Sequence, residues 1–475
     1  MIGITLGPRI KQYAVVIVAN LSIIHLGISV SWSSPVIVKL MDKNTTTLSR
    51  VLTDAEVSWM SSISPLAAIL ICFMTTLVLD GIGRKKCLLF VSVLRVTGIL
   101  MFMFGKEVWI LLLARAVSGM SDCFYLAALT TYTSEIASKE IRGALGTITQ
   151  ISSGIGQMII LTIGPFVSYN TLHIIWLCIV VVVTIPVFVL PETPYYLYVT
   201  GNEEKSLKVL TFLRSSETLA KEEAKEYSDS TKDNKIRTID LIKDKTVIKT
   251  IGKVIFLAVE LQLMGLNALT FYLQPIFQST NTNIPPEICS VAIGCTQVVG
   301  CIVTILLTDK YGRKPVLTFS LLGCSIGMIS LGVFFKLIEQ NHTVNGFLNV
   351  LPLLSIMVYI FCFNSGMGPL FWPLVAELFE GPARAIGVTT GVFVTSTFVF
   401  LVTKFFGQVT LIVGPAPTYW FFAANCLLVW IFIMYFVPET KGKSFAEIQK
   451  ALGTNDKKTV DSVNKDCFFF ISICC

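Results

Sequence analysis

The chain has 475 residues, of which 53% are hydrophobic and only 14% are charged, and its formal net charge is +7. Soluble domains carry about 25% charged residues, so this composition excludes an ordinary water-soluble enzyme and indicates a protein embedded in lipid. The excess of basic residues suits the anionic head groups of a bilayer, and we expect no nucleic-acid partner.

Apolar runs recur along the whole chain. Each is close to or above the ~18 residues needed to cross ~30 Å of hydrocarbon as a helix. Helices are required because backbone groups in lipid must be satisfied within their own segment. We therefore predict an all-α membrane protein with twelve transmembrane helices. The predicted spans are residues 14–38, 58–79, 87–104, 108–134, 144–168, 172–190, 251–279, 287–308, 315–335, 347–376, 385–411 and 417–437.

A polar segment rich in lysine and glutamate, residues 191–250, separates the sixth span from the seventh. We interpret it as a cytoplasmic helical connector. It divides the chain into an N-terminal six-helix half, residues 1–190, and a C-terminal six-helix half, residues 251–437. A cytoplasmic tail, residues 438–475, completes the predicted domain organisation.

Charged landmarks follow the second, fourth and sixth spans, and they recur in the same order after the eighth, tenth and twelfth. Asp80 and Arg84 correspond to Asp309 and Arg313, Glu135 and Arg142 correspond to Glu377 and Arg384, and Glu192 corresponds to Glu439. Parallel repeats of this kind build transporters whose substrate site lies between the halves, near the middle of the membrane. The repetition therefore predicts two pseudo-symmetric halves around a central site.

Basic residues indicate the orientation of the chain. If the N-terminus is cytoplasmic, the outer segments hold few of the 37 lysines and arginines: Lys39, Lys43, Arg50, Lys106 and Lys336. The positive-inside rule therefore predicts that both termini are cytoplasmic. Two N-x-T sequons, at Asn44 and Asn341, fall in predicted outer loops, where glycosylation is possible. We expect a multi-pass protein of the plasma membrane.

Three sequence motifs resemble those of the sugar porters of the major facilitator superfamily, and the likeness covers nearly the whole chain. They are PETKGKSFAEIQ at Pro438–Gln449, GMGPLFWPLVAEL at Gly366–Leu378, and Glu135 followed by RGALGT at Arg142–Thr147. The run TKFFG, Thr403–Gly407, is most similar to the insect facilitated trehalose transporters and their hexose-carrying relatives. The resemblance implies a facilitative trehalose or hexose transporter that works by alternating access.

The repeated charges lie at predicted inner ends of spans. Arginine presents a planar fork that pairs bidentately with carboxylates. The resemblance implies that such pairs tie the span ends together when the inner side is closed and part when it opens. The alternative is solvated charge that merely obeys the positive-inside rule.

Polar side chains within the spans are the candidates for sugar binding. Amides both donate and accept hydrogen bonds, and an aromatic ring can cover the C–H face of a sugar. The candidates are Gln150, Gln262, Asn267, Gln297 and Trp372. The resemblance implies sugar contacts at Gln150, Gln262 and Asn267. The alternative is that buried amides only join neighbouring helices, and for Asn364 and Tyr272 a structural role is an equal expectation.

Glycine and proline predict where the helices bend or approach closely. Gly366, Gly368 and Pro369 are expected to break the tenth span just before Trp372. Gly154 and Gly156 are expected to let helices pack closely.

The sequence departs from the family pattern where a sugar is held. Leu261 replaces the first of two adjacent glutamines, Gln297 replaces an asparagine, Phe371 replaces a proline, and Ser396 stands where a second tryptophan is common. These changes remove hydrogen-bonding and stacking capacity from a pocket fitted to glucose. They leave the identity of the sugar open.

Energy coupling depends on acids within the spans. Proton-driven relatives carry an acid in the first span, and the aligned residue here is Ser33. Because an intramembrane acid usually marks a relay or ion path, its absence favours downhill diffusion. Asp122 and Glu260 keep a proton-coupled symporter open as an alternative, although Arg95 could pair with Asp122.

Other classes of protein fit less well. The sequence contains no metal-ligand spacing, nucleophile motif or phosphate-binding loop. We therefore expect no enzyme activity, metal or cofactor, and a monomer whose partners are a sugar and the bilayer. A non-transporting sugar receptor with the same fold remains the second alternative.

Overall fold

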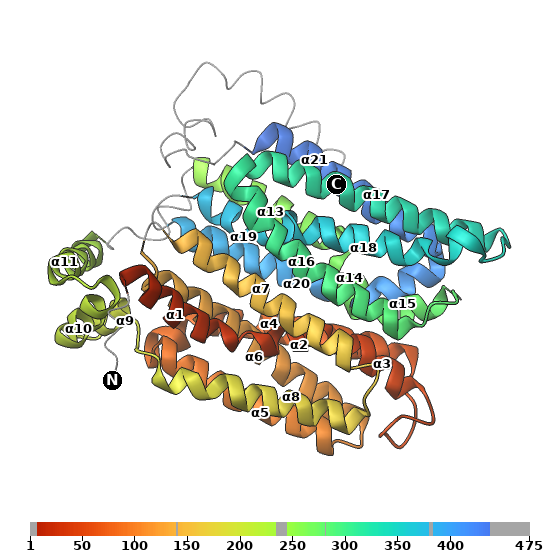
Figure 1. The fold of residues 1–475 in the computed structure, drawn as a ribbon, viewed down its shortest axis with the longest axis horizontal. Coiled ribbons are helices and arrows are strands. Elements are labelled where there is room, and N and C mark those ends of the chain that lie inside the picture. Colours follow the sequence, from red (N-terminus) through yellow and green to blue (C-terminus); the bar gives the residue numbers. More distant parts are fainter. Residues whose placement is uncertain (1–6, 139–140, 234–244, 281, 380–382, 438–475) are drawn as a thin grey trace.

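The structure is a computed structural model, and it describes residues 7–138, 141–233, 245–280, 282–379 and 383–437 (Figure 1). The described residues are nearly all helical and contain no β-strand. The prediction of an all-α protein is therefore confirmed.

The N-terminal half contains six predicted spans, and the first of them is interrupted twice. This first span consists of α1 (Pro8–Leu21), α2 (Ile24–Ser31) and α3 (Ser33–Met41). The remaining five are α4 (Asp54–Ile82), α5 (Arg84–Phe104), α6 (Val108–Ile136), α7 (Arg142–Ile163) and α8 (Tyr169–Thr184), which continues into the 3-10 helix η1 (Ile185–Val189).

Three short helices follow in the connector: α9 (Pro194–Val199), α10 (Glu203–Arg214) and α11 (Glu217–Asp233). The C-terminal half begins with a second interrupted span, made of α13 (Lys245–Leu263), α14 (Leu266–Phe271) and α15 (Leu273–Ser279). It continues with α16 (Pro286–Tyr311), α17 (Arg313–Glu339), η2 (Gly346–Asn349), α18 (Leu351–Asn364), α19 (Met367–Glu377), α20 (Ala383–Val413) and α21 (Pro415–Phe436).

Each predicted span coincides with one helix or with one interrupted helix. Eleven segments of the described chain are long and apolar enough to cross a bilayer. The fifth predicted span is represented by α7, whose apolar stretch Ile148–Ile163 is shorter than the others. The twelve predicted spans therefore all have a helical counterpart.

Capping side chains and proline determine where several helices begin. At the start of α4, Glu56 accepts a hydrogen bond from the Thr53 backbone N–H at 2.9 Å, and the Thr53 hydroxyl accepts one from Glu56 N–H at 3.4 Å. This capping box satisfies two backbone donors that the helix leaves unpaired. At the start of α21, Pro415 occupies the first helical position, where its missing N–H costs nothing.

Figure 1 shows the two halves side by side, with α9–α11 projecting from one end. We call this end the connector end, and the opposite end, where loops 42–53 and 340–346 lie, the loop end. The halves pack against each other through α7 with α16, α4 with α20, and α3 with α15. Buried apolar side chains form one cluster that continues across this junction, from Trp32 to Phe371.

The same turn occurs once in each half. Gly83, between α4 and α5, has a φ of +92°, and Gly312, between α16 and α17, has a φ of +90°. Only glycine adopts this region without strain. The two glycines occupy equivalent places after Asp80 and Asp309, so the repeat in the sequence is also a repeat of backbone conformation.

Candidate functional site

Two helix breaks place polar groups where the halves meet. Between α13 and α14, Gly265 has a φ of +90°, and a Cβ there would lie 2.5 Å from the Phe422 ring. Only glycine fits this position. Between α18 and α19 the helix is interrupted next to Gly366, so the break predicted in the tenth span is confirmed.

The first amide pair lies across the α13–α14 break. Asn267 Nδ2 donates to Gln262 Oε1 at 2.5 Å. Gln262 is buried and Asn267 is half-buried. The break therefore brings together two of the amides that the sequence predicted as sugar ligands. Since an amide both donates and accepts, a sugar hydroxyl has the chemistry to replace either partner.

A second amide pair joins the two halves. Gln297 Nε2, on α16, donates to Gln157 Oε1, on α7, at 2.8 Å. Ser31 Oγ, on α2, donates to the same oxygen at 3.2 Å. Gln297 was predicted as a site residue, whereas Gln157 and Ser31 were missed. Gln157 lies seven residues after Gln150, on the same face of the helix, and this spacing could have identified it.

Gln150 and Trp372 occupy neighbouring elements of opposite halves. Gln150 is half-buried on α7 and Trp372 is half-buried on α19, and α7 packs against α19. The Trp372 ring lies edge-on to Phe371, with 4.9 Å between ring centroids. A Cβ at Gly391 would be 3.7 Å from the indole, so α20 also lies beside the Trp372 ring.

The other two polar candidates have structural partners. Asn364 Nδ2 donates to the Ile360 carbonyl at 2.8 Å within its own helix. The Tyr272 hydroxyl donates to the Thr403 carbonyl at 3.1 Å. These contacts favour the structural role for both residues.

Glycines hold α2 and α7 in backbone contact. A Cβ on Gly27 would lie 2.0 Å from the Ser153 carbonyl oxygen, and one on Gly156 would lie 2.0 Å from the Ile24 carbonyl oxygen. The close approach predicted for Gly156 is confirmed. Gly154 instead faces α16 of the other half, where a Cβ would find ordinary contact distances.

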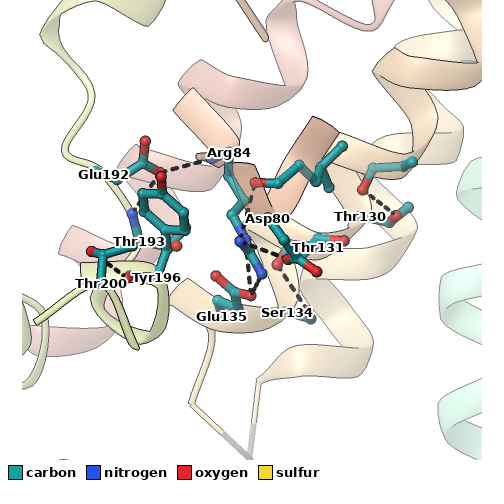
Figure 2. A network of polar contacts seen from close by, with 12 residues as sticks. Asp80, Arg84, Thr130, Thr131, Ser134, Glu135, Glu192, Thr193, Tyr196 and Thr200 are labelled. Carbon is teal, nitrogen blue, oxygen red and sulfur yellow. Dashed lines mark hydrogen bonds and ion pairs between the residues drawn. The ribbon is translucent and has the colours of Figure 1, made fainter. Parts of the chain in front are cut away.

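At the connector end of the N-terminal half, Arg84 is the centre of an ionic network (Figure 2). Its Nη2 lies 3.0 Å from Glu135 Oε1, and its Nη1 lies 3.2 Å from Asp80 Oδ1. The guanidinium also lies 5.2 Å from the centroid of the Tyr196 ring. These contacts tie the α4–α5 turn to the end of α6 and to the connector.

Glu192 caps the start of α5 from the side of the connector. Its Oε1 accepts hydrogen bonds from the backbone N–H groups of Arg84 and Lys85, both at 3.1 Å, and of Thr193 at 3.0 Å. The first N–H groups of a helix have no partner within it, and the positive end of the helix dipole favours an anion there. The carboxylate therefore binds the helix end rather than an arginine side chain.

The connector is anchored to the same region. Arg214 donates to both carboxylate oxygens of Glu223, at 2.7 and 2.9 Å, and to the Ile136 carbonyl at 3.0 Å. Burial raises the pKa of the Tyr227 phenol, which donates to Glu223 at 3.0 Å. A cavity of about 560 Å³ lies between these side chains and Glu135.

Most of the other predicted gate residues have side chains, or a backbone, that the structure does not describe. The side chains of Arg142, Asp309, Glu377 and Arg384, and the whole of Glu439, lie outside the described part of the chain. Arg313 is described and half-buried at the start of α17. The role of these residues as a gate stays a prediction.

Two buried arginines and one half-buried aspartate lie within the N-terminal half. Arg95 forms an ion pair with Asp122, which confirms the predicted pairing, and Ser29 Oγ donates to Asp122 Oδ2 at 2.7 Å. Arg115 donates to the Ser29 carbonyl at 2.9 Å and lies over the Trp32 ring. These contacts join α2, α5 and α6.

Glu260 is different, because it is 8% exposed on α13 and its Oε2 has no hydrogen-bond partner among the described residues. It lies two residues before Gln262, which places it on a different face of the helix. The carboxyl is therefore not part of the amide pair at the break.

At the loop end, hydroxyls of the first span bond to backbone groups of the other half. Ser33 Oγ donates to the Phe271 carbonyl at 3.3 Å, and Ser34 Oγ accepts from the Gln274 backbone N–H at 3.1 Å. Ser33, where an acid was expected in proton-driven relatives, thus contributes to the contact between the halves.

Comparisons with known proteins agree with this architecture. Residues 27–452 match the profile of the family described as "Sugar (and other) transporter". The facilitated trehalose transporter Tret1 of Polypedilum vanderplanki is 30% identical over 93% of this chain and 88% of its own length, and Tret1 of Culex quinquefasciatus is 27% identical over 93% and 86%. The E. coli xylose transporter XylE in a partially occluded inward open conformation, 20% identical, has a TM-score of 0.76 over 91% of this chain and 99% of that one.

Proposed function

Because the chain belongs to the sugar (and other) transporter family, we propose that it is a facilitative carrier of trehalose or a hexose and works by alternating access. The observation that carries this proposal is the pair of amide clusters at the junction of the halves. One cluster, Gln157 with Gln297, spans the junction itself. A sugar bound there would contact both halves, which is what a carrier needs if occupancy is to influence their movement.

The proposed sugar site comprises Gln150, Gln262, Asn267, Gln297 and Trp372, with Gln157 and Ser31 added. Amides supply donors and acceptors for several hydroxyls, and the half-buried indole supplies an apolar face. The halves, residues 1–190 and 251–437, would rock about this site while the connector 191–250 and the tail 438–475 stay on one side. The similarity to Tret1 proteins supports trehalose as the first sugar to test.

The proposed inner gate uses the repeated charges. In the N-terminal half the proposed gate residues are Asp80, Arg84, Glu135, Glu192 and Arg142. In the C-terminal half they are Asp309, Arg313, Glu377, Arg384 and Glu439. The Arg84 network supports this role for the first set, since it joins three elements at one end of the half.

In this proposal the connector end faces the cytoplasm and the loop end faces outward across the plasma membrane. Asn44 and Asn341 are exposed at the loop end, which supports their assignment as glycosylation sites. The carrier would act as a monomer, without enzymatic activity or cofactor. Glycosidase treatment of the protein from membranes, with Asn44→Gln and Asn341→Gln as controls, tests the orientation.

Downhill diffusion is favoured because Ser33 bonds to backbone and Asp122 is neutralised by Arg95. Glu260 Oε2, which has no hydrogen-bond partner in the described ranges, favours a second candidate, a proton-coupled symporter. A symporter would accumulate sugar only when a pH difference is imposed, and Glu260→Gln would abolish that accumulation. A facilitative carrier would equilibrate sugar in both cases.

The test of function is uptake of labelled sugars by liposomes that contain the full chain, with a panel of unlabelled sugars as competitors. Asn267→Ala and Trp372→Ala are each expected to reduce uptake about tenfold or more, since each removes a direct contact. Gln340→Ala, which alters an exposed amide at the loop end, is the matched control. Unchanged uptake in both site variants would remove the proposed site, and binding without flux would indicate a receptor.

The gate has its own test. Arg142→Ala and Arg384→Ala should change the turnover rate more than the half-saturating sugar concentration, because the gate does not touch the sugar. A loss confined to affinity would contradict this assignment.

A further inference from the structure

The segment Thr403–Gly407 carries the TKFFG run singled out in the sequence but has no part in the proposed sugar site. It lies on α20, in the part of the helix nearer the loop end. Phe406 is buried, and its ring lies 5.4 Å from that of Tyr272. The carbonyls of Thr403 and Lys404 each accept a hydrogen bond from another element. This segment is therefore a junction between helices.

Lys404 contacts the opposite half in two ways. Its carbonyl accepts a hydrogen bond from Ser58 Oγ at 2.6 Å. Its ammonium lies 3.7 Å from the centroid of the Trp59 ring, well within the distance of a cation–π contact. Ser58 and Trp59 are adjacent on α4 of the N-terminal half, so one lysine meets two neighbouring residues across the junction.

A simpler explanation is that both residues are anchors at the membrane surface. Lysine commonly extends toward water and tryptophan is enriched at that depth. Lys404, however, lies nine residues before the end of α20 at Val413, or ~13 Å along the helix. Its ammonium lies over a ring of the other half. Independent anchors would act separately, whereas a contact pair would be energetically coupled.

We propose that Lys404 and Trp59 form a cation–π latch that holds the loop end of the carrier closed, and that this latch breaks each time the loop end opens. The inference rests on the proposed function, because α4 and α20 belong to halves that part at this end only if the protein alternates. Ser58 sets the register of the latch through its bond to the Lys404 carbonyl. Lys404 and Trp59 thereby influence how often sugar can enter from this side.

Hydrogen exchange of the full chain in lipid nanodiscs tests the latch without relying on transport. Trp59→Ala and Lys404→Met should each raise the exchange rate of peptides covering residues 54–62 and 266–279 about fivefold, as expected for loss of one cation–π contact. The double variant should exchange no faster than either single variant. Lys404→Arg keeps the cation and should restore the parent rate.

Two further variants serve as controls for the hydrogen-exchange experiment. Trp59→Phe retains a ring and replaces the alanine variant if that protein fails to fold, with a smaller expected rise. Lys336→Met removes a loop-end lysine whose partner, Glu339, lies on its own helix, and it should leave the rate unchanged. Additive effects in the double variant, an equal rise in Lys336→Met, or no rise in either single variant would overturn the latch.

Liposome uptake of the same variants separates the two proposals. If the exchange pattern appears as expected while neither parent nor variants carry any sugar, the coupling between Lys404 and Trp59 stands, whereas the proposed sugar transport, and with it the role of the pair in a transport cycle, fails. If sugar is carried and the exchange rates do not change, the latch fails and the proposed function stands.

Discussion

The two ends of the molecule are held together by different kinds of contact. At the connector end, the buried Arg84 forms ion pairs inside one half, with the largely buried Glu135 and the exposed Asp80. At the loop end, the contacts join the two halves and involve hydroxyls and backbone groups, as between Ser34 and Gln274. Lys404, which contacts the opposite half toward that end, meets a ring rather than a carboxylate.

This difference matches what each end has to do. Removing one partner of a buried ion pair typically costs about 3–5 kcal/mol, because the other charge is left uncompensated. A neutral hydrogen bond contributes about 1 kcal/mol. The ion pairs of the connector end are therefore costlier to break than the hydrogen bonds that join the halves at the loop end.

The largest effect is expected when the ion pairs of the connector end are removed. Arg84→Ala leaves Glu135 buried without its cation and should lower the free energy of unfolding by about 3–5 kcal/mol. Thermal or chemical unfolding of the purified protein measures this. Lys86→Ala, at an exposed position of the same helix, is the control. Equal stability of Arg84→Ala and the parent would show that the ion pairs do not hold this end.

An intermediate effect is expected between the two ends, where Gln157 and Gln297 bond across the junction. Replacing either by alanine should raise the half-saturating sugar concentration about tenfold and change the unfolding midpoint little. Since the two amides are partners, the double variant should be no worse than the poorer single variant. Simple additivity of the two losses in uptake measurements would show that they act apart.

The smallest effect is expected when one hydrogen bond between the halves is removed at the loop end. Ser58→Ala removes the bond to the Lys404 carbonyl, worth about 1 kcal/mol, and should speed hydrogen exchange at the loop end a few-fold without lowering the unfolding midpoint. Ser62→Ala removes a hydroxyl that bonds only to the Ser58 carbonyl of its own helix, and it serves as the control. A marked loss of stability in Ser58→Ala would place this contact among the strong ones.

The sequence was sufficient for features that depend on local pattern. Apolar runs predicted all twelve spans, because a helix in lipid needs length and little else. Glycine and proline at residues 366–369 predicted the break before Trp372, and the pairing of Arg95 with Asp122 followed from two opposite charges in adjacent spans. The amides Gln262 and Asn267 stay predicted sugar ligands, and the structure places them in hydrogen-bond contact with each other.

The features that were missed depend on which helix face meets which. Gln157 and Ser31 carry ordinary polar side chains, and only the packing of α2, α7 and α16 brings them to Gln297. Lys404 and Trp59 are separated by most of the chain, and no spacing rule connects them. Glu192 was expected to join the cluster of charges around Arg84. It lies there by binding the backbone N–H groups of Arg84 and Lys85, which a list of side chains does not reveal.

The backbone contact at Gly27 and Gly156 has a consequence for selectivity. With no side chain between them, α2 and α7 are in contact along their carbonyls and have no room to slide. Ser31 and Gln157 therefore travel as one unit when the half moves. In the proposed site, a sugar in contact with Ser31 and Gln157 would meet the same arrangement of donors and acceptors from either side of the membrane. The accessible side could then change while substrate selectivity stays the same.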